Sequence, residues 1–592
     1  NYILNGKFSK NNPANYGIIL EKIVSAVYEA QKFMRENYEI SAVSLRDIKR
    51  FIKLFEYFIN ITKERKEFEN PDFSSIKDNF LLSVVKTDEL KKENIIILKA
   101  ANLSLFICYY VRINDIIKRK EFSGVIEKII KFDFLKYPTD LEKELSDNLN
   151  LDKGIAKNSA LLDILFTLFV CIINNIPVII TGKSGSGKSL CFSLLLQAMK
   201  GENSKNPFFQ KYPSLFVSSY QVSQINNYSK IKELFKTSKK INEKQKDVKK
   251  YITVILFEQM ELAEISPLNL LNVIHSELDE IQGISFVGIS NQPLDASKMN
   301  RAINLSVNEL GLNDLTLTAT SIACDIYEEI EKIIPYKNLI LNLAKAYFDY
   351  KIFLNKYSFS NCDFHGLRDF YSLIKMTSRE LKNSLNKKSI ETIAIENIEK
   401  NFGGLKLRQE NDILYSSTKK FKELFLKYQN IFIKEEINYL EFEKNRYLLI
   451  ITNKTKNETL IKFIMEKLGK KYKYLLGSNL EEDQNEEYRL EKLRPIISYI
   501  ENGKILILKD FNIVYSNLYN LFDQNFENIE TSQYAKIFIN SNVEERYPLD
   551  KNFRCIVLLE QNEVDEKNYS FLNRFEKHLM SFEYLLTEEQ NN

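Results

Sequence analysis

Tryptophan is absent from the 592 residues, histidine occurs three times, and cysteine occurs six times. No two cysteines have the CxxC spacing, so neither a disulfide framework nor a zinc finger is expected, and a reducing, cytoplasmic location is predicted. The histidines, at positions 275, 365 and 578, lie too far apart in sequence to indicate a histidine metal site. We attribute the missing tryptophan to an AT-rich genome, because Lys, Asn and Ile are used heavily.

An excess of either charge is also lacking, since 83 Lys and Arg face 79 Asp and Glu, a net charge of +4. This near-balance gives no electrostatic reason to expect nucleic acid or an anionic membrane as a partner. The most apolar stretch, 164–173, is about half of the ~20 residues that a membrane span needs. We therefore expect a buried helix there and no transmembrane segment. The sequence begins at Asn1 without a signal-like leader, and we expect it to be part of a longer protein.

Two stretches of the chain alternate strand-like and helical patterns, which predicts α/β folding with parallel sheets joined by helical crossovers. The strand candidates are 176–181, 251–257 and 284–290 in the first stretch and 446–452, 504–510 and 553–559 in the second. Helical periodicity fills 19–34, 44–59 and most of 310–400. We expect a Lys-rich loop before residue 251, and breaks in the helical pattern at 70–75, 137–140 and 402–407.

One motif carries clear chemistry, because it satisfies G-x-x-x-x-G-K-[ST] in full between a strand and a helix. It consists of Gly182, Lys183, Ser184, Gly185, Ser186, Gly187, Lys188 and Ser189. The glycines allow backbone N–H groups to turn inward around phosphates, and the following helix presents its positive end. Lys188 is expected to reach the β- and γ-phosphates of ATP, and Ser189 to ligate Mg²⁺.

The acidic pair that a P-loop enzyme needs is expected after the second strand candidate, TVILFEQ. In the natural register Glu258 takes the metal side and Gln259 the position of the base. Since an amide cannot accept a proton from water, Gln259 should slow hydrolysis and leave nucleotide binding intact. In another register, Glu261 or Glu264 supplies the carboxylate.

Three further polar residues follow in a characteristic order. Asn291 ends the third strand candidate, where its side chain would orient the attacking water. Arg301 lies in a loop ten residues later, and Arg368 opens a helix in the helical region. The order of loop, acid pair, Asn, Arg and helical Arg is the layout of an AAA+ ATPase.

The chain also resembles mysterin, a giant ring-finger E3 ubiquitin ligase with a dynein-like AAA+ core. The resemblance rests on LAEISP (262–267), FVGISNQPLDASKMNRAI (286–303) and GLRDFYSLIKM (366–376). It extends to VSLRDIKR (43–50) at one end and to LNRFEKH (572–578) at the other. The short echoes between the LRD segments, and between MNR and LNR, indicate tandem copies of one module.

The resemblance implies roles for single residues. Ile155, within Gly-Ile-Ala ahead of the P-loop, would contact the nucleotide. Asn291 would be the first sensor, Arg301 the arginine finger and Arg368 the second sensor. Arg46 would be the second sensor of the preceding unit. Arg574 would be the finger that faces the ATP held by Lys188, whereas Arg301 would face the unit before it.

Two departures from the family pattern matter for function. Glu258 and Gln259 stand where the family has Asp-Glu, and TNKTKNET (452–459) stands where the trailing unit would carry a P-loop. That unit is therefore expected not to bind nucleotide. The zinc-bound clusters of ubiquitin transfer are missing from this sequence, so any contact with a ubiquitin-conjugating enzyme would lie elsewhere in the protein.

We accordingly divide the chain as follows: 1–60 the helical lid of a preceding AAA+ unit, 61–150 a helical linker, 151–310 an AAA+ α/β subdomain, 311–400 its helical lid, 401–444 a helical connector, and 445–592 a degenerate α/β subdomain. The leading functional hypothesis is ATP occupancy that sets the conformation of adjacent AAA+ units. The alternatives are an active mechanochemical ATPase of the dynein or midasin type, and a scaffold with a permanently bound nucleotide.

Overall fold

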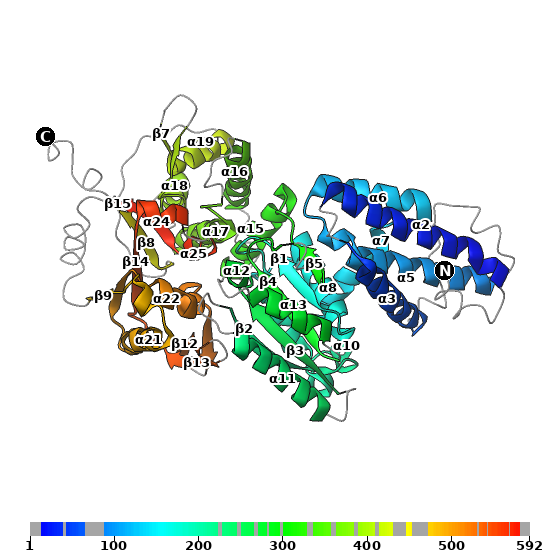
Figure 1. Cartoon of the computed structure of the whole chain (residues 1–592). Coiled ribbons are helices and arrows are strands. Elements are labelled where there is room, and N and C mark those ends of the chain that lie inside the picture. Colours follow the sequence, from blue (N-terminus) through cyan, green and yellow to red (C-terminus); the bar gives the residue numbers. More distant parts are fainter. Residues whose placement is uncertain are drawn as a thin grey trace. The chain divides into compact units, whose positions relative to one another are not determined.

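The chain forms two compact units, which we describe separately (Figure 1). The computed structural model describes residues 13–38, 43–64, 88–222, 228–244, 250–265, 270–280, 283–295, 300–327, 336–356, 363–383, 389–408, 414–429, 446–452, 472–529, 532–540, 543–566 and 569–580. Unit 1 contains the chain up to Leu151 together with 159–182 and 186–309. Unit 2 contains 152–158, 183–185 and everything from Leu310 onward.

Unit 1 begins with a helical bundle. Its helices are α2 (Pro13–Asn37), α3 (Leu45–Glu64), α5 (Asp88–Cys108), α6 (Ile116–Ile130) and α7 (Lys136–Asp147). The two helices predicted within 1–60 are confirmed, and Ser44 caps α3 because its hydroxyl accepts a hydrogen bond from the Arg46 N–H at 3.2 Å. Because α3 packs against α5 and α2 against α6, helices from the expected lid and from the expected linker belong to one bundle.

Two details of this bundle differ from expectation. Residues 137–140 do not interrupt the helical pattern but form the first turn of α7, where Pro138 has no N–H to lose from the helix. Residues 70–75 lie outside the described residues. The segment Glu93–Arg112 is long and apolar enough to cross a membrane, but it is entirely buried here, and core helices of soluble proteins pass the same test.

The first parallel sheet follows in unit 1. Its strands are β1 (Val178–Thr181), β2 (Ser214–Gln221), β3 (Tyr251–Glu258), β4 (Ser285–Ser290) and β5 (Ile303–Ser306), in the spatial order β2-β3-β4-β1-β5. The strands predicted for β1, β3 and β4 are confirmed. The sequence analysis missed β2 and β5, because β2 lacks a continuous apolar run and β5 has only four residues.

Helices cover this sheet on its two faces. On one side lies α8 (Ser159–Ile173), the buried helix expected at 164–173, beside α9 (Lys188–Ala198). On the other side α11 (Tyr228–Lys244) and α13 (Leu270–Glu280) bury apolar side chains against β3 and β4. The Lys-rich segment before residue 251 is therefore largely helix and not loop, because Ile231 and Phe235 recur at helical spacing and are fully buried.

Unit 2 begins with the helical region predicted for 310–400. It contains α15 (Leu312–Tyr327), α16 (Lys337–Lys356), α17 (Leu367–Asn383) and α18 (Ile390–Asn401). Within 401–444 the structure shows a short antiparallel pair, β6 (Lys406–Arg408) with β7 (Leu414–Ser416), and then α19 (Ser417–Gln429). The predicted helical connector is thus partly a hairpin, which follows the break expected at 402–407.

The second parallel sheet has the spatial order β15-β8-β14-β10-β9. Its strands are β8 (Leu448–Thr452), β9 (Tyr472–Leu476), β10 (Ile505–Lys509), β14 (Arg554–Glu560) and β15 (Glu576–Met580), flanked by α21 (Glu486–Glu501), α22 (Asn512–Tyr515), α23 (Tyr519–Phe522), α24 (Gln561–Glu566) and α25 (Tyr569–Leu572). The predictions for β8, β10 and β14 are confirmed, and β9 and β15 were missed.

An antiparallel sheet is inserted between β10 and β14. It consists of β11 (Phe526–Ile529), β12 (Ser532–Asn540) and β13 (Val543–Pro548), none of which the sequence analysis anticipated. Without the insertion, the two parallel sheets have the same order. In both β2-β3-β4-β1-β5 and β9-β10-β14-β8-β15, the second strand along the chain is followed by the third, fourth, first and fifth. The chain therefore holds two α/β subdomains of one topology.

Candidate functional site

The candidate site gathers at one edge of the first sheet. In parallel strands the carboxyl ends point the same way, and the register pairs Thr181 of β1 with Ser290 of β4 and Gln221 of β2 with Glu258 of β3. The P-loop leaves β1 at this edge, and Asn291 follows β4 there. This is the position at which open α/β sheets bind ligands.

The loop itself needs glycine at defined positions. Gly185 and Gly187 have φ angles of 87° and 86°, which side-chain-bearing residues rarely adopt. At Gly182 a Cβ would lie 2.7 Å from the Cβ of Val307, so a larger residue would push against the neighbouring chain. At Gly187 a Cβ would meet no atom within 4 Å, so the loop is open at that point.

Lys188 begins α9 directly after this turn. Its side chain is buried, and its ammonium group donates to the Gly182 carbonyl at 2.6 Å and to the Ser186 hydroxyl at 3.3 Å. The Lys188 ammonium group thus lies against the loop that is expected to surround the phosphates. Ser189, the expected Mg²⁺ ligand, is exposed. Lys183 is exposed as well and forms an ion pair with Asp363 at 2.7 Å.

The acidic strand ends as the preferred register predicts. β3 ends at the half-buried Glu258, and Gln259 follows with a positive φ of 59°, an unusual conformation for a residue other than glycine. Gln259 is buried, and among the described residues its amide oxygen has no hydrogen-bond partner. The Gln259 side chain is therefore fixed at the strand end with an unsatisfied acceptor.

Glu261 holds Asn291 in place. Its two carboxylate oxygens accept hydrogen bonds from the Asn291 backbone N–H at 3.0 Å and from the Asn291 side-chain amide at 2.8 Å, and Glu261 is 3% exposed. Glu264 is exposed and accepts from the Asp295 N–H at 3.1 Å. The alternative register offered Glu261 or Glu264 as the carboxylate. Among the interactions that we describe, Glu261 contacts a predicted site residue and Glu264 does not.

The two arginines predicted for the preceding interface meet at one carboxylate within unit 1. Arg301 forms an ion pair with Asp279 at 2.5 Å, and Arg46 reaches the other oxygen of Asp279 at 3.4 Å. Arg301 also contacts His275 on the same helix. Arg46 and Asp279 are both more than a third exposed, so this cluster lies at the surface of unit 1.

Unit 2 contains the same arrangement in a more buried form. Arg368 bonds to Asp523 at 2.9 Å, and Arg574 contacts the same carboxylate oxygen. The Arg574 guanidinium also lies 4.0 Å from the ring centre of Tyr519. Burial lowers the pKa of Arg368 to about 10, which the Asp523 charge partly opposes. The structure thus brings together the predicted second sensor and the predicted finger, while their roles toward ATP stay predictions.

The tip of the P-loop contacts α17 within unit 2. The Tyr371 hydroxyl donates to the Gly185 carbonyl at 3.1 Å, and a Cβ at Gly185 would lie 3.2 Å from the Arg368 backbone nitrogen. Ile155 lies in the segment 152–158, which also belongs to unit 2, and is half-buried. The predicted lid arginine therefore begins its helix beside the predicted phosphate loop.

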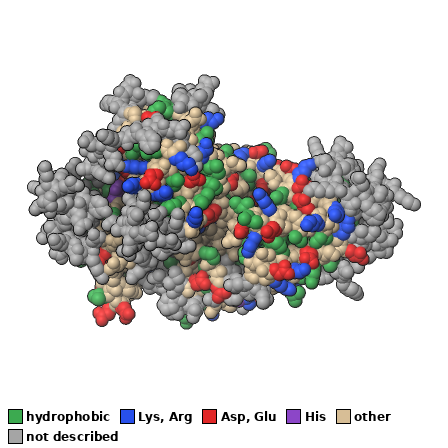
Figure 2. Space-filling view, turned by 90° about the horizontal axis from the view of Figure 1, so that it is seen from above, with side chains coloured by type: hydrophobic (Ala, Val, Ile, Leu, Met, Phe, Trp, Pro, Cys, Tyr) green, Lys and Arg blue, Asp and Glu red, His purple; other side chains and the backbone are tan. Residues whose placement is uncertain are grey.

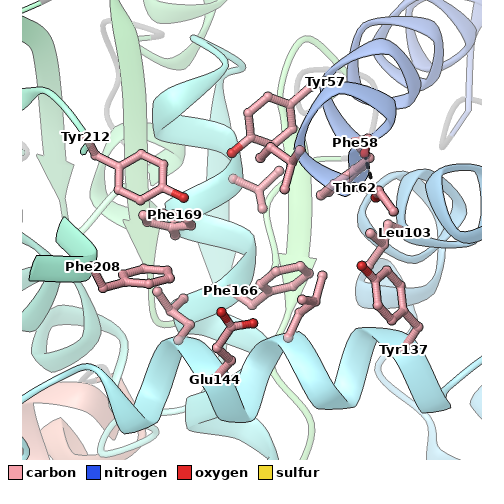
Figure 3. A pocket seen from close by; sticks show the side chains of 14 residues that line it. Tyr57, Phe58, Thr62, Leu103, Tyr137, Glu144, Phe166, Phe169, Phe208 and Tyr212 are labelled. Atoms are coloured by element: carbon pink, nitrogen blue, oxygen red, sulfur yellow. Dashed lines mark hydrogen bonds between the residues drawn. The ribbon is translucent and has the colours of Figure 1, made fainter. Parts of the chain in front are cut away.

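A cavity in unit 1 differs in character from the region around the P-loop (Figure 3). It measures about 30 Å³ and lies among aromatic side chains such as Tyr57, Phe166 and Phe208, with Glu144 as the one charged residue of its lining. It offers little room and few polar groups to a ligand. Within the described ranges, no group of three or more His, Cys, Asp or Glu side chains is placed to hold a metal ion.

The sequence analysis missed the two carboxylates that organise the arginines, Asp279 and Asp523. Each ends or follows a helix in an otherwise ordinary stretch, so their spacing gave no signal. The sequence offered one hint: the LRD and NR motifs each occur twice, which implied that both copies of the module have equivalent residues around them. Glu261 was considered only as a substitute for Glu258, and its contact with Asn291 depends on a turn that the sequence pattern does not encode.

Comparisons with known proteins agree with this architecture. Two family models, each described as an RNF213 AAA domain, match residues 154–314 and 438–586. The chain is 28% identical over 590 residues to the E3 ubiquitin-protein ligase rnf213-beta of Danio rerio, and 27% and 26% identical to the E3 ubiquitin-protein ligases RNF213 of Homo sapiens and Mus musculus. These matches cover 94%, 96% and 97% of this chain and 11% of each relative.

One solved structure, a closed state of Hsp104 with ATPγS and FITC casein, aligns over 74% of this chain and 82% of its own with 12% identity and a TM-score of 0.27, which is too low to bear on the fold. The two parallel sheets and the two matched domains establish a tandem AAA+ α/β fold. RNF213 and mysterin are two names for one family. The chain belongs to this family, as a segment of its AAA+ region that spans about a tenth of the length of the relatives it matches.

Proposed function

We propose that this segment binds ATP with Mg²⁺ at the loop 182–189 and that nucleotide occupancy controls the conformation of adjacent AAA+ units. The observation that carries the proposal is the buried Lys188 ammonium, held 2.6 Å from the Gly182 carbonyl inside a glycine loop at the start of α9. Phosphate oxygens are strong acceptors for an ammonium group, and this position at the start of a helix places the lysine where phosphates would bind.

The residues present fit a magnesium nucleotide. Lys188 and the first N–H groups of α9 supply positive charge for the phosphates. Ser189 supplies a hydroxyl and Glu258 a carboxylate, and oxygen ligands of these kinds suit Mg²⁺. Bound Mg²⁺ would neutralise phosphate charge, while Lys188 and α9 position the phosphates.

Slow hydrolysis is the second part of the proposal. Gln259 can hold a water molecule through its buried amide oxygen but cannot remove a proton from it, and general-base help is typically worth ~10²–10⁴-fold in rate. Asn291, which would orient that water, has its side-chain amide bonded to Glu261. Both features favour retention of ATP over rapid turnover.

The ligase function belongs to the longer protein. The relatives named E3 ubiquitin-protein ligases are about nine times the length of this chain, which covers 11% of each. We propose that this segment is a regulatory AAA+ part of such an enzyme, located in the cytoplasm, and that ubiquitin transfer and contact with a ubiquitin-conjugating enzyme occur in other regions. Neighbouring AAA+ units of the same protein are the partners proposed for this segment itself.

Binding of a fluorescent ATP analogue to the purified chain tests the first part. Lys188→Ala is expected to abolish binding, whereas Lys183→Ala, which removes a lysine of the same loop that pairs with Asp363, is expected to change the affinity little. Unchanged affinity in Lys188→Ala would place the nucleotide elsewhere. Nucleotide that copurifies and does not exchange would favour the scaffold hypothesis.

Single-turnover hydrolysis tests the second part. Gln259→Glu is expected to accelerate hydrolysis with little change in ATP affinity, and fast turnover by the unchanged chain would contradict the proposal. The competing function, an active mechanochemical ATPase, is favoured by the position of Glu261 beside Asn291. If Glu261 is the catalytic base, the unchanged chain turns over quickly and Glu261→Gln abolishes that turnover.

A further inference from the structure

Strand β2 forms one edge of the first sheet, since β3 is its one neighbour in the order of the described strands (Figure 1). Its eight residues, SLFVSSYQ, include no charged residue, proline or glycine. Proteins usually protect an exposed sheet edge with charges, with proline or with a covering element, because an open edge can pair with another strand. The sequence of β2 supplies neither the charges nor the proline.

The other edges of the two parallel sheets are better protected. β5 contacts the short helix η4 (Tyr110–Arg112), and β15 contacts α18. β9 has only five residues, and the exposed Lys473 lies within it. Among the sheet edges that the structure describes, β2 is therefore the one that is both long and uncharged.

Alternate backbone groups of β2 point away from the sheet. The Ser214 N–H donates toward β3, whereas the Leu215 N–H donates to the Met199 carbonyl on the other side. The direction alternates along a strand of a parallel sheet, so the N–H groups of Val217 and Ser219 also point outward. Among the described residues these two N–H groups have no hydrogen-bond partner. The outer edge of β2 thus presents backbone groups in the spacing of a strand.

Two exposed aromatic side chains lie on one face beside this edge. Phe216 is 41% exposed, and Tyr251 at the start of β3 is 47% exposed. They share a face with Tyr220 and Phe257, which lie an even number of residues further along the same strands and pack with ring centres 5.0 Å apart under α11. A strand added at the edge would cover part of this exposed apolar surface.

Lysines surround the start of β2. Lys200 follows α9, Lys211 lies three residues before the strand, and Lys250 immediately precedes β3. All three are exposed, and none of them forms an ion pair in the contacts described. Between Lys200 and the strand, Glu202 is the one acidic residue. Helix α11, which packs on these strands, has six lysines and two glutamates. On the face that Figure 2 shows, by contrast, basic and acidic side chains lie side by side.

We propose that the open edge of β2 binds an extended acidic segment of a partner protein by strand addition. In this mode, main-chain hydrogen bonds supply affinity and alternate side chains supply specificity. The outward N–H groups of Val217 and Ser219 provide the bonds, Phe216 provides an apolar contact, and the unpaired lysines select carboxylates. A nucleic acid would satisfy the lysines, but it has no peptide groups with which to continue the ladder.

Fluorescence anisotropy with a labelled peptide of alternating Glu and Val tests the proposal. The peptide has eight residues, the length of β2, and is expected to bind the purified chain. The same peptide with Lys in place of Glu should not bind, because the lysines around the edge repel it. The acidic peptide N-methylated at each of its central amides should not bind either, since it lacks the donors for a ladder.

Ser219→Pro is the matched change in the protein. The proline ring replaces an outward N–H and leaves the ladder to β3 intact, and proline is found naturally on edge strands. The affinity should fall by about tenfold or more, because an edge donor is lost and the ring obstructs the incoming strand. Ser219→Ala keeps the N–H and should bind normally. Since Ser219 is exposed, we expect both variants to fold, which their melting temperatures check.

Charge variants test the selection of an acidic partner. Lys200→Gln/Lys211→Gln should weaken binding by about three- to tenfold, the effect of losing two exposed ion pairs. Lys120→Gln/Lys128→Gln removes the same charge from exposed positions of α6 in the same unit and should leave the affinity unchanged. Equal losses in the two double variants would show a general charge effect and overturn the proposal.

The remaining outcomes separate strand addition from other occupants of the edge. Unchanged affinity in Ser219→Pro, or equal binding of the N-methylated peptide, would show attraction of charge without a ladder. Single-stranded DNA that binds as tightly as the peptide would show a surface for anions in general. Self-association that Ser219→Pro abolishes would show that a second copy of the chain covers the edge. Each of these results overturns the proposal, as does absence of peptide binding. If Ser219→Pro does not fold, the N-methylated peptide decides the question with the unchanged chain.

Discussion

The two α/β subdomains share one strand order and carry different parts of the expected AAA+ site. In the first, the P-loop after β1 is intact, but the residue after β3 is Gln259, with φ 59°. In the second, the residue after the equivalent strand β10 is the carboxylate Asp510, with φ 61°, whereas TNKTKNET replaces the P-loop after β8. The unusual backbone turn is kept in both copies. The turn is therefore a property of the fold, and the chemistry placed on it can change independently.

The junction between the LRD helix and the following NR segment is also built twice. In unit 1 the buried Asp47 accepts from the Ser44 N–H at 2.7 Å and pairs with Arg50 and Arg112, and Arg50 donates to the Asn300 carbonyl at 3.0 Å. In each compact unit a helical part is thus joined to the α/β subdomain that follows it in sequence.

Unit 2 repeats this junction with other partners. The buried Asp369 accepts from the Gly366 N–H at 2.8 Å and pairs with Arg446 and Lys577, and Arg446 donates to the Asn573 carbonyl at 3.3 Å. Only the cations differ: two arginines in unit 1, one arginine and one lysine in unit 2. This difference predicts different responses to mutation and to pH.

The largest expected effect comes from neutralising the central carboxylates. Asp369→Asn and Asp47→Asn should each lower the free energy of unfolding by ~3–5 kcal/mol at pH 7, because buried cations lose their partner. Burial already lowers the pKa of Lys577 to about 8, and loss of Asp369 lowers it further. Above that pKa the unfolded state binds more protons, so the stability of Asp369→Asn should recover as the pH rises toward 9.5.

Asp47→Asn is the matched control for this recovery. Its neighbours are arginines, which stay charged throughout the range, so its loss of stability should be independent of pH. Urea unfolding at pH 7 and pH 9.5 measures both variants. A similar recovery in both, or in neither, would break the proposed contrast between the two junctions.

Acid should destabilise unit 2 before unit 1. His365 is fully buried between the Tyr350 hydroxyl and the Gly403 carbonyl, and burial lowers its pKa from 6.5 to about 3. Between these values the unfolded state binds more protons, so stability is lost as the pH falls below 6.5, by ~1.4 kcal/mol per pH unit and about 2 kcal/mol at pH 5. The histidine of unit 1, His275, is only half-buried.

Hydrogen exchange read by mass spectrometry follows the two units separately. Peptides from α17 and α19 should lose protection between pH 7 and pH 5, after correction for the intrinsic exchange rate, while peptides from α3 keep theirs. His365→Gln should flatten the dependence in unit 2. Equal loss in both units would refute the assignment to His365.

The paired arginines predict a smaller effect, on nucleotide affinity. Asp523→Asn releases Arg368 and Arg574 from their shared carboxylate, and ATP binding should tighten by about tenfold, since charged hydrogen bonds contribute ~1.5–3 kcal/mol and repulsion between the arginines offsets part of this. Asp279→Asn releases Arg46 and Arg301, which we expect to serve the preceding unit, and should leave the ATP affinity unchanged. Equal effects of both substitutions would contradict the assignment of the fingers.

The sequence predicts the features that depend on residues close together in the chain, and it misses those that depend on contacts between distant segments. The P-loop, the acidic strand and Asn291 were predicted because their chemistry is encoded in contiguous residues with fixed spacing. The short strands β5 and β15 were missed, since a four- or five-residue strand owes its existence to the neighbours it pairs with. The antiparallel insertion was missed for a similar reason, because β11 and β13 are largely polar and bury little apolar surface.

Charge pairs between distant segments were the least predictable feature. Asp523 lies 155 residues from Arg368, and nothing in its local sequence marks it. Lys577 and Asp369 are 208 residues apart and meet only when the lid packs on the second sheet. The tandem echo of LRD and NR was visible in the sequence, but the carboxylates that connect the two motifs depend on tertiary structure.

The smallest expected effect concerns the caps of the two LRD helices. Ser44 accepts from the Arg46 N–H, whereas unit 2 has Gly366 at the equivalent position. Ser44→Ala should cost ~1 kcal/mol of stability, and Ser44→Gly only a few tenths, because glycine is itself an acceptable cap. In unit 2, a serine in place of Gly366 should not stabilise the protein, although serine is a good cap. A Cβ at Gly366 would lie 2.7 Å from the side-chain nitrogen of Asn573, which is buried and donates to the Asp363 carbonyl.

Gly366→Ser is therefore expected to destabilise unit 2 by ~1–3 kcal/mol, the usual cost of overpacking, in spite of the added hydroxyl. Relief of the contact provides the decisive control. In Gly366→Ser/Asn573→Ala the clash partner is gone, so the serine should cost less than it does in the presence of Asn573. Urea unfolding of the four members of this double-mutant cycle gives the coupling energy. A coupling near zero would mean that Gly366 is kept for its backbone and not for the close approach of Asn573.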